Sequence, residues 1–256
     1  MIRVKATSID SHLREALIRE PMRAMVHSIF QHALNLRSMG EKLILLAGPF
    51  KLNGPDTILV PCSDFRSLSV RQGMDVLLTP EEIKINGSLL ISLKEASLWK
   101  GDFLCCSKES LSDEPGWVLR KLLEKRRPAK DEAAVYLKIQ ALKGQELPTI
   151  FRTLIGMGPG LTPAGDDFLL GLLSALKFTG KSFIPELPGR TSFLSQSILR
   201  KALSGRFPEV VSSFFRALLH RDREGMKRAG QRILGIGASS GRFIVEGILW
   251  GLTCCS

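Results

Sequence analysis

The stretch GMGPGLTPAGDDFLLGLLSAL, residues 156–176, decides the fold of the second half of the chain. It joins a loop rich in glycine and proline to the run FLLGLLSAL (168–176), which is apolar all round apart from Ser174. A helix without a polar face must be surrounded by other helices. The stretch therefore predicts the central helix of a helical bundle, and it places Asp166 and Asp167 at the start of that helix.

The start of this helix carries two adjacent acids, although one is enough for a helix end. Thr162 fits the N-cap and Pro163 the first helical position, so that Asp166 and Asp167 lie near the first turn. An acid there complements the helix dipole, which is the purely structural alternative. Successive side chains diverge by about 100° around a helix. We therefore predict that one carboxylate binds loop amides while the other serves as a magnesium ligand, a general base or a partner for a substrate amide.

A second glycine-rich stretch near the C-terminus, LGIGASSGRFIVEGILWGL (234–252), repeats this design. Each stretch has a G-x-G, and each has a helix glycine, Gly171 or Gly247, six residues after Gly165 or Gly241. Small residues on one helix face allow a neighbouring helix to approach closely. We expect the two helices to pack through Gly171 and Gly247 and to bring their loops together. Two helix N-termini at one place would form an anion site.

The predicted site draws on both loops. Its catalytic candidates are Asp166 and Asp167. Its candidate substrate-binding residues are Gly158, Gly160, Thr162, Gly165, Ser239, Ser240, Gly241 and Arg242. The residues leave the metal open, and magnesium is the ion that the carboxylates would suit. A P-loop is excluded, because Asp166 and Asp167 stand where the motif needs Lys and Ser or Thr.

The first half of the chain has the sequence pattern of short β-strands separated by Gly, Pro and Asn. The segments are RAMVHSIF (23–30), KLILLAG (42–48), DTILVP (56–61), DVLLT (75–79), EEIKI (81–85) and SLLISL (88–93). Asn86-Gly87 between the last two predicts a type I′ hairpin turn. A helix is expected at 11–20, capped by Ser8 or Asp10. Together these features predict a small antiparallel sheet or barrel.

Beyond Trp99 the apolar residues recur with the period of a helix. The predicted helices are 116–127, 131–144, 191–205, 208–220 and 223–235, with Thr191 as a cap and Gly144, Gly205 and Gly235 as stops. The fold class is therefore α+β. Its expected domains are a β-rich domain with an N-terminal helix (1–100), a linker (101–115) and a helical domain that carries both glycine loops (116–256).

Composition limits the class of protein. The net charge is +11, but the densest basic run, 120–130, has the leucine spacing of a solvated helix and no interleaved aromatic residues, which argues against a nucleic-acid platform. The five cysteines form no C-x-x-C and indicate neither a disulfide framework nor a zinc site. No apolar run approaches the roughly 18 residues of a membrane span. A cytoplasmic protein without a membrane partner is expected.

GMGPGLTPAGDDFLLGLLSAL closely resembles the hallmark G-x-G-P-G-L-T-P-S-G-D-D-F-L-x-G of a bacterial family, one branch of which is the oxamate carbamoyltransferase subunit AllH. That enzyme of allantoin, and so purine, catabolism converts oxalurate and phosphate to oxamate and carbamoyl phosphate. The resemblance covers Gly156 to Gly171 almost without gaps. The second loop departs from the family, because Ala238 replaces a frequent His and Arg242 follows Gly241. Arg242 is expected to clamp a carboxylate or phosphate instead.

The resemblance implies a subunit of a carbamoyltransferase-like enzyme that binds a small anionic ureido acid, with phosphate as co-substrate. It also implies an acyl-CoA-synthetase-like partner subunit and a third protein. A second hypothesis makes the chain a non-catalytic scaffold or regulatory subunit, in which the glycine loops serve only helix packing. A nucleic-acid-binding protein is a third hypothesis, and only the charge of +11 favours it.

Overall fold

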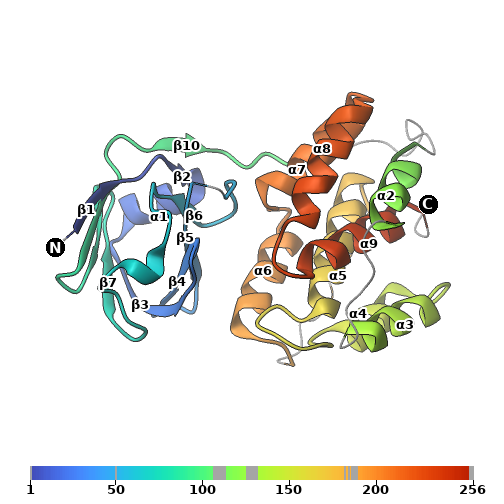
Figure 1. The fold of residues 1–256 in the computed structure, drawn as a ribbon, viewed down its shortest axis with the longest axis horizontal. Coiled ribbons are helices and arrows are strands. Elements are labelled where there is room, and N and C mark those ends of the chain that lie inside the picture. Colours follow the sequence, from blue (N-terminus) through green and yellow to red (C-terminus); the bar gives the residue numbers. More distant parts are fainter. Residues whose placement is uncertain are drawn as a thin grey trace. The chain divides into compact units, whose positions relative to one another are not determined.

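The structure is a computed structural model that describes residues 2–49, 51–105, 114–124, 132–181, 183, 185 and 190–253. The chain divides into two compact units, Met1–Asp102 and Phe103–Ser256 (Figure 1). Residues 106–113 of the expected linker, residues 125–131 of the expected helices and basic run, and Cys106, Cys254 and Cys255 lie outside the described residues.

The first unit is a curled mixed sheet with one helix against it (Figure 1). Its strands, within the described residues, are ordered β1-β9-β8-β7-β3-β4-β5-β6-β2-β10. They are β1 (Ile2–Lys5), β2 (Ser8–Asp10), β3 (Met22–Ile29), β4 (Ala33–Ser38), β5 (Leu43–Ala47), β6 (Thr57–Leu59), β7 (Asp75–Leu78), β8 (Glu82–Ile85), β9 (Leu89–Ser92) and β10 (Ser97–Trp99). The helix is α1 (Ser11–Arg19), and a short 3₁₀ turn covers Phe65–Ser67.

The link between β1 and β2 explains the curl of the sheet. These strands are separated by only two residues, yet they lie near opposite ends of the strand order. The Ala6 amide donates to the Ser92 carbonyl at 2.9 Å, and the Thr7 amide donates to the Leu59 carbonyl at 2.8 Å. One short link thus bonds strands from both ends and bends the sheet into a half-barrel. The α1 residues Leu13 and Leu17 are fully buried in its core.

The predicted β fold of this unit is confirmed, but the sheet is neither small nor purely antiparallel. The pairs β1–β9, β2–β10 and β5–β6 are parallel. The prediction missed β1, β2, β4 and β10, and each parallel pair except β5–β6 includes one of these short strands. The partners of β1, β2 and β10 are distant in sequence, so no local turn signal marks these strands, whereas β4 pairs with its sequence neighbours β3 and β5.

Two local predictions in this unit can be checked directly. β8 and β9 pair antiparallel, and Asn86 and Gly87 both have positive φ, as a type I′ turn requires. Asp10 is the N-cap residue of α1, but its side chain makes no cap hydrogen bond. Its carboxylate instead accepts the Asp56 amide at 2.7 Å, which ties α1 to the segment before β6.

The second unit is helical (Figure 1). Its described helices are α2 (Glu114–Glu124), α3 (Ala133–Ala141), α4 (Leu147–Leu154), α5 (Ala164–Phe178), α6 (Phe193–Leu203), α7 (Glu209–Leu219), α8 (Arg223–Leu234) and α9 (Ser240–Thr253). Every residue of α5 except Lys177 is buried, so the predicted central helix is confirmed. The sequence did not predict α4, which spans only eight residues and has little room to show a period.

Helices α5 and α9 pack backbone against backbone through their glycines. A Cβ atom on Gly171 would lie 2.1 Å from the Ile244 carbonyl oxygen, and one on Gly247 would lie 2.0 Å from the Phe168 carbonyl oxygen. No side chain fits at either place, because real Cβ contacts essentially never fall below 3.0 Å. The expected approach of the two helices through Gly171 and Gly247 is therefore confirmed.

Most predicted helix ends that fall on described residues are correct to within two residues, but the predicted helix 131–144 extends three residues beyond the end of α3 at Ala141. Gly235 is the C-cap of α8, and Gly144 and Gly205 follow α3 and α6 with positive φ. The N-caps of α5 and α6 are Pro163 and Ser192, each one residue after the predicted cap. None of the helices that the structure describes is long and apolar enough to cross a membrane.

Candidate functional site

Both glycine loops run directly into the starts of α5 and α9, where a glycine sits against another carbonyl group. A Cβ atom on Gly165 would lie 2.0 Å from the Leu154 oxygen, and one on Gly241 would lie 1.9 Å from the Ile233 oxygen. The close approach thus fixes where each helix starts. Gly165 and Gly241, predicted to bind substrate, have a packing role in the structure, and their role in binding stays a prediction.

The two loops meet through hydroxyl groups. Thr162 Oγ1, in the first loop, lies 3.2 Å from Ser240 Oγ, at the start of α9. Both side chains also hydrogen-bond the Asp167 carboxyl group. The structure therefore brings Thr162, Asp167 and Ser240 together, as the matched glycine spacing of the two loops predicted. Thr162 is not the helix cap, because its hydroxyl is turned to this cluster and Pro163 takes the cap position.

Asp167 holds a carboxyl group that titrates near neutral pH. The residue is only 7% exposed, and burial raises the pKa of Asp167 from 3.8 to about 7. The hydrogen bond from Ser240 opposes this rise, the negative charges of Asp166 and Glu132 add to it, and the bond from Thr162 opposes it. Loss of water around a carboxylate favours its neutral form. Asp167 can therefore both donate and accept a proton at neutral pH.

Asp166 is buried as well, but both of its carboxylate oxygens accept hydrogen bonds within the chain. Oδ1 accepts the Gly156 amide at 2.8 Å, and Oδ2 accepts the Thr191 hydroxyl. Gly156 has a φ of 71°, and a Cβ atom on it would lie 2.3 Å from the Arg190 oxygen. Asp166 thus holds the first loop against the segment before α6. Thr191, which the sequence indicated as a cap, is part of this arrangement.

The first turns of α5 and α9 use most of their amides within the chain. The Gly165 amide donates to Met157 O at 2.9 Å, and the Asp166 and Asp167 amides donate to Pro163 O at 2.9 and 3.1 Å. The Gly241 amide donates to Ile236 O at 3.0 Å. An anion held by the first turn of α5, which the sequence favoured, would therefore find few amide donors there.

The loop before α5 contains backbone amides that are available as hydrogen-bond donors. Within the part of the chain that the structure describes, the amides of Gly158, Gly160, Leu161 and Thr162 donate to no protein acceptor. Gly158 and Gly160 have φ values of 112° and 98°, which only glycine adopts easily. Gly160 and Leu161 are exposed. Successive backbone amides without an acceptor in such a loop form a concave donor surface that suits an anion.

Arg242 lies beside the cluster in sequence but is directed toward α2 and α3. Its Nη1 donates to Leu123 O at 3.4 Å, and its guanidinium group lies 5.4 Å from the ring centre of Tyr136. Burial raises the pKa of Glu246, one turn further along α9, and the Arg242 charge lowers it. The predicted role of Arg242 as an anion clamp stays a prediction. Ser239 is half-buried, and its carbonyl accepts the Arg242 amide.

Glu132 is a participant that the sequence did not indicate. It is the N-cap residue of α3, it is buried, and its charge raises the pKa of Asp167. It stands outside both glycine loops and outside any motif, so only the tertiary packing of α3 reveals it. Among the described residues, no group of three His, Cys, Asp or Glu side chains could hold a metal ion, and the magnesium hypothesis stays a prediction.

Two family comparisons match this chain. Residues 5–98 match the AllH family N-terminal domain, and residues 154–252 match the family described as oxamate carbamoyltransferase subunit AllH. The first match covers the curled sheet from the end of β1 into β10, and the second covers both glycine loops and helices α5 to α9 except the last residue of α9. Searches of curated proteins and of solved structures gave no match. The two matches take in most of the chain, which therefore belongs to the AllH family, the family of a subunit of oxamate carbamoyltransferase.

Proposed function

We propose that this chain is the subunit of a carbamoyltransferase that binds a small anionic ureido acid at its two glycine loops, and that Asp167 carries the proton during transfer. One observation carries the proposal: a buried carboxyl group with a pKa of about 7 is bonded by hydroxyl groups from both loops. Structural carboxylates at helix starts normally stay ionised at neutral pH. A carboxyl group tuned to pH 7 is instead typical of acid–base chemistry.

The reaction named by the family needs such a group. For oxalurate and phosphate, a phosphate oxygen attacks the carbamoyl carbon, and the bond from that carbon to the oxamate nitrogen breaks. The nitrogen leaves with the electron pair and takes up a proton, while the phosphate loses its own hydroxyl proton. Protonated Asp167 can donate to the nitrogen and then accept the proton from phosphate, so the protons balance. Thr162 and Ser240 are half-buried, and their hydroxyl groups hydrogen-bond the Asp167 carboxyl group.

The other residues of the site have distinct proposed roles. Asp166 positions the first loop through Gly156 and Thr191 rather than touching the substrate. The unspent amides from Gly158 to Thr162 bind the carboxylate or phosphate oxygens. Arg242 contributes positive charge from the second helix. By resemblance, the partner subunits are an acyl-CoA-synthetase-like protein and a third chain. The proposed activity therefore belongs to the assembled complex, and the isolated subunit should be inactive.

The test is carbamoyl phosphate formation from oxalurate and phosphate by the assembled complex. Asp167→Asn keeps the shape and hydrogen bonding of the side chain but cannot donate and accept the proton, so turnover should fall about 100- to 10,000-fold. Glu224→Gln, the same change at an exposed position on α8, is the control and should leave turnover unchanged. Full turnover by an assembled Asp167→Asn complex would contradict the proposal and favour the scaffold hypothesis, in which the loops only pack helices.

A further inference from the structure

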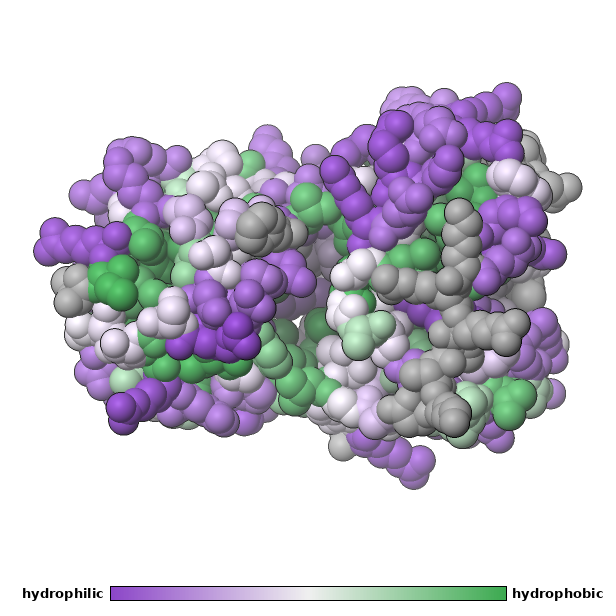
Figure 2. Space-filling model, viewed as in Figure 1, coloured by the Kyte–Doolittle hydropathy of each residue, from purple (hydrophilic) through white to green (hydrophobic). Residues whose placement is uncertain are grey.

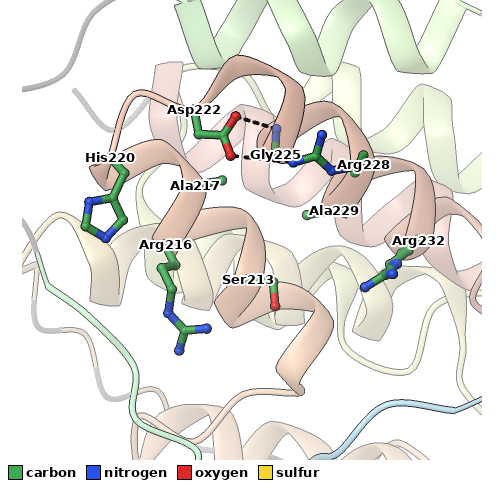
Figure 3. Close-up of a pocket in the computed structure, with 9 residues that line it drawn as sticks. All are labelled: Ser213, Arg216, Ala217, His220, Asp222, Gly225, Arg228, Ala229 and Arg232. Carbon is green, nitrogen blue, oxygen red and sulfur yellow. Dashed lines mark hydrogen bonds and ion pairs between the residues drawn. The ribbon is translucent and has the colours of Figure 1, made fainter.

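An open hollow lies between α7 and α8, and no residue of either glycine loop lines it (Figure 3). Its volume is about 310 Å³. Its polar lining includes Ser213 and Arg216 on α7 and Arg228 and Arg232 on α8. None of them belongs to the cluster around Asp167. Hydrophilic side chains cover α8 around it (Figure 2).

The hollow is positively charged, and two of its charges are uncompensated. It contains three arginines and one acid, Asp222. Asp222 caps α8 by accepting the Gly225 amide at 2.8 Å, and it lies 3.6 Å from Arg228. Within the described residues, Arg216 and Arg232 make no ion pair. Arg228 and Arg232 lie four residues apart on one helix, where like charges repel. Arg216 and Arg232 are both exposed, and an anion bound between the helices would reduce this repulsion.

The spacing on each helix places its polar lining residues on one face. Ser213 and Arg216 are three residues apart on α7, and Arg228 and Arg232 are four apart on α8, so each pair shares a helix face. In Figure 3 the guanidinium groups of Arg216 and Arg232 lie on either side of the Ser213 hydroxyl. A hydroxyl donor between two guanidinium groups matches the oxygens of a phosphate or carboxylate group, which arginine binds in a bidentate manner.

Small residues on α7 and α8 leave the space that forms the hollow. Ala217 and Ala229 are buried at the floor of the hollow. Gly225 lies against α7, since a Cβ atom on it would be 3.0 Å from the Ala217 Cβ and 2.2 Å from Asp222 Oδ2. Longer side chains at these positions would fill the space. The volume lies at the low end of small-molecule sites, so it suits a compact ligand rather than a dinucleotide.

We propose that the α7–α8 hollow is an anion site that takes a phosphate group, either free phosphate or a small phosphate monoester, between Arg216, Arg232 and Ser213. The site is independent of the proposed carbamoyl transfer, because it shares no residue with the glycine loops. A phosphate dianion compensates both arginine charges at once. A monoester would direct its organic part outward, since the floor offers only small apolar residues.

The experiment is calorimetric titration of the full chain with inorganic phosphate and with glucose 6-phosphate at low ionic strength. The charge-reducing pair Arg216→Gln and Arg232→Gln should weaken phosphate binding at least about tenfold. The control pair, Arg152→Gln and Lys227→Gln, removes the same charge from exposed positions on α4 and α8 that do not line the hollow, and should bind as wild type. Tighter binding of one probe identifies the free ion or the ester as the ligand.

A second measurement needs no variant. Phosphate should protect Arg216 and Arg232 from modification by phenylglyoxal, as mass spectrometry of the peptides reports, and should leave Arg152 reactive. Equal loss of affinity in both double variants would overturn the proposal, because it would mean diffuse attraction to a basic surface. Tighter binding of an oligonucleotide that both double variants weaken alike would overturn it in the same way. Unchanged affinity in the Arg216→Gln/Arg232→Gln variant, or no protection, would also overturn it.

Discussion

The two glycine loops of the helical unit share one backbone design and carry opposite charges. A Cβ atom added to Gly165 or to Gly241 would lie about 2 Å from a backbone carbonyl oxygen of the segment that precedes the helix. Six residues on, Gly171 and Gly247 lie equally close to the carbonyl groups of the partner helix. The residue after the first glycine, however, is Asp166 in one loop and Arg242 in the other.

This difference separates what packing requires from what chemistry requires. The glycines have no alternative, because any side chain would collide with backbone that cannot move away cheaply. The positions next to them are not constrained in this way, and the two loops use them differently. Asp166 bonds its own loop, Arg242 is directed toward α2 and α3, and only Asp167 is held by both loops.

The largest expected effect tests the shared backbone design. Gly171→Ala or Gly247→Ala should lower the free energy of unfolding by about 3 kcal/mol or more, because the new methyl group overlaps a carbonyl of the facing helix. Gly116→Ala in α2 is the matched control, since its Cβ would make ordinary contact at 3.5 Å with Thr253, and stability should change by less than about 1 kcal/mol. Denaturant unfolding gives both values. Similar stability of Gly247→Ala and Gly116→Ala would contradict the close pairing of α5 and α9.

The next effect concerns the acid that distinguishes the first loop. Because the pKa of Asp167 is raised to about 7 in the folded chain, the folded state holds this proton more tightly than the unfolded state. Its contribution to stability is therefore present at about pH 4 and is lost as the pH rises toward 8. Comparison of wild type with Asp167→Asn across this range isolates the contribution, on the order of 2–4 kcal/mol. Parallel stability curves for the two proteins would show that Asp167 titrates normally.

A smaller effect separates Asp166 from its neighbour. Asp166→Ala removes the acceptor for the Gly156 amide and the Thr191 hydroxyl, which should lower the free energy of unfolding by about 2 kcal/mol. Asp166→Asn keeps one acceptor oxygen and should lose less. Both changes remove a negative charge beside Asp167, so both should lower the pKa of Asp167. Thermal unfolding and the pH profile of turnover measure the two consequences. A rise in that pKa would contradict the arrangement of the two carboxylates.

The sequence predicted those parts of the fold that depend on local pattern. The central helix, the hairpin at Asn86-Gly87 and the glycine pairing of α5 with α9 follow from apolar period, turn chemistry and small-residue spacing. The parallel pairs β1–β9 and β2–β10 do not, because they join segments distant in sequence. The link between β1 and β2 bends the sheet through hydrogen bonds to Ser92 and Leu59, and no residue near the link signals these partners.

The candidate site likewise has one part that the sequence predicted and another that depends on tertiary packing. Thr162, Asp167 and Ser240 were predicted to meet because two matched loops point to one place, and they do meet. The direction of Arg242 and the presence of Glu132 depend on how α2 and α3 pack against α9 and α5, which no motif encodes. The one-residue error at Thr162 and Thr191 has a chemical cause: both hydroxyls bond an aspartate and leave the cap position to the following residue.

The smallest expected effect tests whether residues of both loops lower the pKa of Asp167. The hydrogen bonds from Ser240 and Thr162 lower the pKa of Asp167, because they stabilise its ionised form. Ser240→Ala and Thr162→Val should each raise that pKa further, by about half to one pH unit, and the Ser240 change should be the larger. NMR titration of the ¹³C-labelled aspartate carboxyl groups measures the change directly. Ser239→Ala, one residue earlier on the second loop, is the control and should leave the titration in place. If Ser240→Ala leaves the pKa of Asp167 unchanged while Thr162→Val raises it, the second loop only packs α9 against α5. If both variants raise it, the proton belongs to a site that neither loop forms alone.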